Sequence, residues 1–154
     1  VLNMTGTDGS AWNNPVKGAE IAKSQQSQGA DVIYAAAGAT GVGVLQAAAD
    51  MKILSIGVDS NQNYMHPGSV LTSMMKRVDT AVYNAFKAGA DLKPGVTVMD
   101  LAAGGVDYAM DDNNASLVTE DMKAKVEEAK AKIISGEIKV HDYMSDNTCP
   151  AAQF

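Results

Sequence analysis

The fold is decided by residues 29–76, which read GADVIYAAAGATGVGVLQAAADMKILSIGVDSNQNYMHPGSVLTSMMK. A short apolar run at 31–36 leads into a glycine-rich turn at 38–43, which opens an alanine-rich helical segment. A second apolar run at 53–58 ends at Asp59. Strand, turn, helix and strand form one βαβ unit, which predicts parallel strands joined by a right-handed crossover. Because ligands bind at the carboxyl ends of such strands, the glycine turn and Asp59 mark the expected site.

Strand and helix patterns alternate along the rest of the chain. Helices are expected at about 15–28, 78–89 and 120–135, and further strands at 1–4, 70–75, 96–102, 106–110 and 138–140. This alternation predicts an α/β fold with a parallel sheet that helices cover on both faces, a three-layer arrangement. A length of 154 residues suits one domain with a sizeable core.

Composition excludes several classes of protein. The net charge of −6 and the lack of a basic run argue against a nucleic-acid partner. No apolar run reaches the roughly 20 residues of a membrane span. A single cysteine, Cys149, allows no intrachain disulfide and favours no thiolate metal site. We expect no metal, no cofactor and no catalytic residues. The start Val-Leu-Asn-Met fits either a mature product or a piece of a longer protein.

The glycine turn allows two interpretations. It could cradle a phosphate, and Asp59 follows Gly38 at the spacing of about 20 residues at which a dinucleotide fold places its ribose-binding acid. Ser73, Tyr83 and Lys87 even supply the residue types of a short-chain dehydrogenase. However, the glycines are spaced G-x-x-G-x-G, and only about forty residues separate the turn from Tyr83. An NAD(P)-dependent oxidoreductase therefore stays an alternative function. The other interpretation is a glycine turn that only allows the strand and the helix to pack closely.

Trp12 is the only tryptophan and lies in a polar loop just before the first expected helix. A bulky aromatic side chain in this position is either a hydrophobic lid on the domain or a stacking surface for a planar ligand. The neighbouring Asn13 and Asn14 can cap the helix or hydrogen-bond to a ligand edge. Both interpretations stay open on the residues alone.

Five blocks of sequence are distinctive when taken in order: SAWNNPVKGAE at 10–20, GADVIY at 29–34, AGATGVGV at 37–44, IGVDSNQ at 56–62 and VLTSMMKRVD at 70–79. Together they resemble the BMP family, the basic membrane lipoproteins, which are similar to the purine nucleoside receptor of spirochaetes. The resemblance covers about residues 10 to 110 and continues more weakly to Val140.

The resemblance implies a type I periplasmic-binding-protein fold, in which two α/β lobes joined by a hinge close on a ligand. Family members are extracytoplasmic receptors of ABC importers, commonly for nucleosides. Residues 1–154 then form the second, C-terminal lobe, with 78–92 as a segment that could belong to the missing N-terminal lobe. The implied partners are a nucleoside, the membrane permease and that lobe. The implied location is the bacterial cell envelope, periplasmic or lipid-anchored. A sensory protein with the same lobe is a further alternative.

The resemblance also assigns ligand contacts one residue at a time. Trp12 matches an aromatic residue, usually phenylalanine, that stacks on the purine, and Asn13 matches a polar neighbour. Gly38 matches a glycine whose backbone approaches the base or sugar. Asp59 matches an aspartate that holds the ribose hydroxyls, although a simple turn acid is its other interpretation. Lys76 matches a lysine that completes the sugar site.

Overall fold

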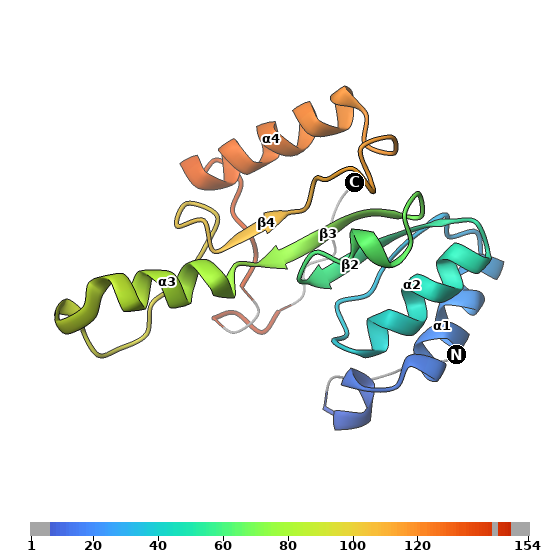
Figure 1. Cartoon of the computed structure of the whole chain (residues 1–154), viewed down its shortest axis with the longest axis horizontal. Coiled ribbons are helices and arrows are strands. Elements are labelled where there is room, and N and C mark those ends of the chain that lie inside the picture. The colour runs from blue at the N-terminus through green and yellow to red at the C-terminus, as the bar shows by residue number, and fades with distance from the viewer. Residues whose placement is uncertain (1–6, 143–144, 149–154) are drawn as a thin grey trace. The chain divides into compact units, whose positions relative to one another are not determined.

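The computed structural model of the chain describes residues 7–142 and 145–148 (Figure 1). The chain divides after Thr119 into two compact units. The first unit holds the sheet and three of the α-helices, and the second holds helix α4 (Glu120–Ser135), which ends before Gly136 in a left-handed conformation. The strand expected at 1–4 lies outside the described residues.

A four-stranded sheet forms the centre of the first unit. Its strands lie in chain order: β1 (Val32–Tyr34), β2 (Leu54–Asp59), β3 (Val70–Lys76) and β4 (Val106–Tyr108). The first three strands are parallel, as the sequence predicts, whereas β4 runs antiparallel to β3. The fold is therefore α/β with a mostly parallel sheet.

Helices α1 (Pro15–Ser27) and α2 (Thr40–Asp50) pack against each other on one side of this sheet (Figure 1). Their interface with β1 is aliphatic and small, built on Ala22, Ile33, Val44 and Ala47. The helices approach closely because α1 carries Gly18 and α2 carries Gly43 where they meet. The helical layer on the second face of the sheet stays a prediction.

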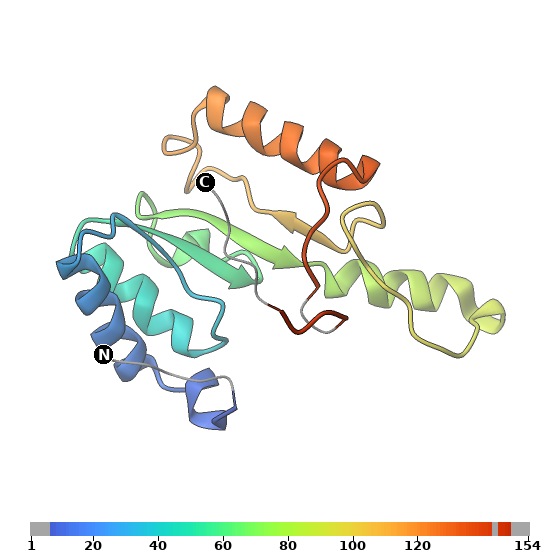
Figure 2. The ribbon, with the colours of Figure 1, turned by 180° about the vertical axis from the view of Figure 1, so that it is seen from behind.

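Helix α3 (Val78–Ala88) continues from the end of β3 and extends away from α1 and α2, as Figure 2 shows from behind. It has no buried residue, and the short 3-10 helix η3 (Gly89–Asp91) follows it. The chain then returns to the same end of β3, where the backbone N–H of Arg77 donates to the carbonyl of Gly105. Because β4 starts where β3 ends, with Val106 opposite Lys76, it must run antiparallel.

Two strand predictions are wrong. Residues 96–102 form no strand, and Val96 is 97% exposed. Residues 138–140 also lie outside any strand. In both segments the apolar residues imitate a strand pattern, but within the described residues no neighbouring strand pairs with them. None of the helices in the described part of the chain has the length and hydropathy of a membrane span.

Candidate ligand-binding site

The carboxyl ends of the three parallel strands gather the residues that the sequence singles out. The turn after β1 carries Gly38, against which Trp12 packs. Asp59 is the last residue of β2, and Lys76 is the last residue of β3. These positions are separate in sequence but share one edge of the sheet, because parallel strands end on the same side.

Trp12 ends a 3-10 helix, η1 (Gly9–Trp12), that is fastened to α2. The Asp8 carboxylate caps η1 by accepting from the backbone N–H of Ser10 at 2.9 Å. The buried Thr40 hydroxyl donates to the Ala11 carbonyl at 2.7 Å and accepts from the Asn14 backbone N–H at 2.8 Å. These bonds fix the loop on both sides of Trp12, which nevertheless stays 48% exposed.

Gly38 lies directly beside Trp12. Its φ of 54° is in the left-handed region, which favours glycine. A Cβ added at Gly38 would lie 3.1 Å from the Trp12 carbonyl oxygen and 3.8 Å from ring atom Cε3. Glycine at position 38 therefore allows the turn to pack against Trp12, and this packing requirement is independent of any ligand.

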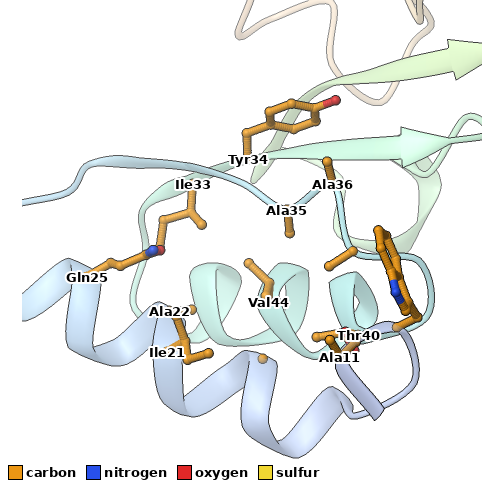
Figure 3. A pocket seen from close by; sticks show the side chains of 13 residues that line it. Ala11, Ile21, Ala22, Gln25, Ile33, Tyr34, Ala35, Ala36, Thr40 and Val44 are labelled. Carbon is orange, nitrogen blue, oxygen red and sulfur yellow. The ribbon is translucent and has the colours of Figure 1, made fainter. Parts of the chain in front are cut away.

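A cavity of about 340 Å³ opens beside Trp12 (Figure 3). Ile21 of α1, Ile33 of β1 and Val44 of α2 line its interior, and Tyr34 points away from the helices. Gln25 of α1 also lines the cavity, which lies beside the outer edge of β1, and β1 has no neighbouring strand on that side among the described residues. At Trp12 and Thr40 the lining combines an aromatic face with a polar side chain.

Asp59 and Lys76 meet across the ends of β2 and β3. The Lys76 Nζ lies 2.8 Å from the Asp59 Oδ1, and both side chains are about half exposed. This contact raises the pKa of Lys76 above its ordinary value, first because the ammonium donates a hydrogen bond to the carboxylate and second because of the opposite charge. The pair lies in a shallow hollow that Ser60, Asn61, Met75, Arg77, Val78 and Asp79 also line.

The predicted site residues thus fall into two groups, Trp12 with Gly38 and Asp59 with Lys76. Trp12 lines the cavity between α1, α2 and β1, whereas Asp59 and Lys76 line a separate hollow at the ends of β2 and β3. Asn13 is exposed, and its backbone N–H closes η1 by donating to the Ser10 carbonyl. The side chain of its neighbour Asn14 caps α1 by accepting from the Lys17 backbone N–H at 3.0 Å, which answers the question of capping for Asn14.

Sequence reasoning missed a set of hydrogen-bonded polar residues behind Asp59, namely the partly buried Gln62 and the fully buried Asn63 and Ser73. A serine between apolar residues of a strand carries no signal that its hydroxyl is used. The dehydrogenase pattern does not describe this Ser73, because its hydroxyl is fully buried and bonded to the loop after β2. No group of His, Cys, Asp and Glu in the described residues is arranged to hold a metal ion.

Comparison with known proteins shows the family of the chain. Residues 6–143 match the Bmp family, described as "ABC transporter substrate-binding protein PnrA-like". The chain is 38% identical to the "CD4+ T-cell-stimulating antigen" of Listeria monocytogenes, over 80% of this chain and 39% of that protein. It is 33% identical to the "ABC transporter nucleoside-binding protein BmpA" of Lactococcus lactis, over 84% of this chain and 41% of that protein.

Among solved structures, an ABC transporter solute-binding protein from Aeropyrum pernix superimposes with a TM-score of 0.72 at 28% identity. That match covers 84% of this chain and 45% of the solved chain. The chain therefore spans less than half the length of these relatives. By the extent of the family match and the identity to its relatives, the chain belongs to the Bmp family of PnrA-like ABC transporter substrate-binding proteins.

Proposed function

We propose that this chain is the second lobe of an extracytoplasmic receptor that delivers a nucleoside with a purine base to an ABC importer. The observation that carries the proposal is the Asp59–Lys76 pair, an ionised carboxylate and an ammonium held together at the sheet edge and open to solvent. Trp12 lines a second hollow, and Gly38 lies directly beside it.

The two groups suit the two halves of a nucleoside. A base stacked on the indole of Trp12 gains roughly 1–3 kcal/mol and can be any of several bases. A carboxylate that accepts from two vicinal ribose hydroxyls forms charge-assisted bonds, each worth about 1.5–3 kcal/mol. Lys76 pairs with the Asp59 carboxylate and can itself donate to a sugar oxygen. A deoxysugar leaves one of these bonds unmade, so it should bind less tightly.

Binding in this proposal is non-covalent, and no reaction follows it. The ligand lies between this lobe and the first lobe, and it stabilises the closed form because only that form contacts it on both sides. The membrane permease then recognises the closed receptor. This lobe alone carries one wall of the cleft, and the loss of about 4 kcal/mol of contacts weakens binding roughly a thousandfold.

We also propose that residues 78–92 pack against the first lobe. Helix α3 turns apolar side chains to solvent instead of to the sheet: Val78, Val82, Tyr83 and Phe86, the last of which is 83% exposed. A helix with an apolar face needs a partner to cover it. The relatives are more than twice as long as the part of them that this chain matches, so the remaining half of the receptor can supply that partner.

The cell envelope is the proposed location. Substrate-binding proteins of ABC transporters act outside the cytoplasmic membrane, either in the periplasm or held at the membrane by a lipid.

The experiment is a titration of the chain with inosine, followed by the fluorescence of Trp12, the only tryptophan. We expect inosine and adenosine to quench the emission, and 2′-deoxyinosine to bind about tenfold less tightly, because it loses one charge-assisted bond. Asp59→Asn should abolish the preference for inosine over 2′-deoxyinosine. The quenching of Trp12 emission at saturating ligand should stay the same. A response to NADPH with none to nucleosides would instead support the oxidoreductase alternative.

A further inference from the structure

Asp59 has an unusual backbone conformation for a side-chain-bearing residue. Its φ is 70°, and the backbone N–H of Ser60 donates to the carbonyl of Val58 at 2.9 Å. A hydrogen bond across a single residue with positive φ is a γ-turn, which is rare and strained. Such strain persists only where the surrounding structure holds it, and it gathers at functional sites.

Three residues hold this turn, and we call Gln62, Asn63 and Ser73 the Asp59 clamp. The Gln62 Oε1 accepts from the Val58 backbone N–H at 2.9 Å, on the near side of the turn. The Gln62 backbone N–H donates to the Ser73 Oγ at 3.0 Å, and that hydroxyl donates to the Asn63 Oδ1 at 2.8 Å. Asn63 and Ser73 are fully buried, so these bonds form away from water and are costly to break.

The strand beneath leaves space for this clamp. A Cβ added at Gly57 would lie 2.6 Å from the Ser73 Oγ and 2.9 Å from the Gln62 Oε1. Only glycine at position 57 therefore allows both oxygen atoms to reach their positions. Gly57 is therefore needed for the hydrogen bonds of the Asp59 clamp.

A second tier of bonds fixes the clamp to the loop after β4. The Asp111 Oδ2 accepts from the Asn61 Nδ2 at 2.6 Å and from the Asn63 Nδ2 at 3.2 Å. The Asn61 Oδ1 in turn accepts from the Asn63 backbone N–H at 3.0 Å. The loop that follows Asp59 is therefore bonded both to β3 and to the loop after β4 before any ligand arrives.

We propose that the Asp59 clamp is a positioning device for the ligand, which holds the carboxylate of Asp59 at the orientation in which it accepts from the sugar hydroxyls. This inference rests on the proposed nucleoside-binding function. A carboxylate that is ordered in advance loses less freedom on binding, so its affinity and its discrimination between sugars are both higher. None of the three clamp residues has to touch the ligand.

The first test needs no ligand. In Ser73→Ala, amide hydrogen exchange at Val58, Ser60 and Gln62 should become about tenfold faster, as the loss of a buried hydrogen bond implies. Ser55→Ala is the matched control, because Ser55 is also fully buried, on an adjacent strand, but its Oγ has no hydrogen-bond partner among the described residues. In that variant, exchange at these three amides should stay unchanged. Unchanged exchange in Ser73→Ala would overturn the clamp.

The second test measures the affinities for inosine and 2′-deoxyinosine in the same variants by Trp12 fluorescence. Ser73→Ala and Gln62→Ala should both reduce the ratio of the two affinities, whereas Ser55→Ala should preserve it. Should Ser73→Ala fail to fold, Gln62→Ala carries the test, because Gln62 is only partly buried. Faster exchange with a preserved ratio would show a purely structural role and overturn the proposal.

The two tests separate this inference from the proposed function. A wild-type chain that binds both nucleosides equally would contradict the role of Asp59 in sugar recognition, and the positioning role would fall with it. The exchange measurement would still decide whether Gln62 and Ser73 hold the turn at Asp59.

Discussion

The Lys76 ammonium lies 2.8 Å from the Asp59 carboxylate, across the ends of adjacent parallel strands. Both side chains are about half exposed, and an ion pair of this kind contributes at most about 1 kcal/mol to stability. Asp59 also has a backbone φ of 70°, which for a residue with a Cβ is unfavourable by about 1–3 kcal/mol. The fold therefore gains little from Asp59, which is expected of a residue kept for binding.

Replacement by glycine tests this conflict between stability and function. Among the described residues, Lys52 and Asp59 are the two non-glycine positions with positive φ, at 59° and 70°. Lys52→Gly should raise the free energy of unfolding by about 1 kcal/mol, because glycine adopts this conformation without strain. Asp59→Gly should be neutral or stabilising by a similar amount, since relief of strain offsets the lost ion pair.

The two glycine variants should differ in binding. Lys52→Gly should leave the quenching of Trp12 by inosine unchanged, whereas Asp59→Gly should remove the preference for ribose. Urea unfolding measures the stabilities. An Asp59→Gly variant much less stable than the wild type would contradict the assignment of strain to Asp59.

The sequence predicts the parallel core well because its signals are local. Apolar runs, the glycine turn and the Asn14–Pro15 helix start each depend on a few neighbouring residues, and β1, β2, β3, α1 and α2 all form. The direction of β4 was not predictable in this way. It follows from the departure of α3 from the sheet, which brings the chain back to the end of β3 that it left.

The remaining differences between the sequence predictions and the structure depend on which segments are neighbours in the folded chain. Val96 and Val98 have the apolar alternation of a strand, but a strand forms only beside another with free hydrogen-bonding groups, and pattern alone does not reveal that neighbour. Asp59 could be singled out because it ends an apolar run. The Asp59 clamp could not, since Ser73 and Asn63 differ from ordinary polar residues only in what they contact.

Close packing between α1 and α2 should depend on Gly18. A Cβ at this position would lie 2.6 Å from the carbonyl oxygen of Thr40, a backbone atom that cannot move away easily. Gly18→Ala should therefore destabilise the chain by about 1–3 kcal/mol, as overpacking generally does. Because the Thr40 hydroxyl holds the loop at Ala11, the emission of Trp12 should also change.

Gly9→Ala is the control for this prediction, because no atom of the described residues lies within 4 Å of a Cβ at Gly9. Thermal unfolding followed by circular dichroism compares the two variants. Equal stabilities for Gly18→Ala and Gly9→Ala would show that the helices do not approach as closely as the structure indicates.

The carboxyl group of Asp111 should titrate abnormally. Its pKa is lowered below 3.8, first by the hydrogen bond from Asn61, and also by bonds from the Asn113 backbone, the Asn113 side chain and Asn63. Because the folded pKa is lower than the unfolded one, the stabilisation is complete above the unfolded value of about 3.8. It is lost as the pH falls through the lowered folded value.

Asn61→Ala should raise the pKa of Asp111 toward its ordinary value, because the bond with the largest effect is removed. Asn113→Ala should raise it less, since its backbone N–H continues to donate to the same carboxylate. Carbon-13 NMR of the carboxyl groups between pH 2 and 6 measures both changes. If the titration curve of Asp111 is the same in the wild type and in Asn61→Ala, the hydrogen bond from Asn61 to Asp111 is contradicted.

The exposed apolar face of α3 should make the isolated chain bind hydrophobic dyes and associate with itself. Phe86→Ser combined with Val82→Ser should reduce both, with a stability change within about 0.5 kcal/mol, because neither side chain is buried. Val16→Ser is the matched control, an equally exposed apolar residue on α1 that lies away from this face. Dye fluorescence and sedimentation velocity measure the two effects.

Reconstitution with the first lobe of the parent receptor then identifies the partner of α3. When the two lobes are produced separately and mixed, Phe86→Ser should weaken their association by about tenfold or more, as expected for a buried aromatic anchor. Val16→Ser should have no effect on the association. If Phe86→Ser reduces self-association but leaves reconstitution intact, α3 is an interface between copies of this chain, and residues 78–92 do not pack against the first lobe.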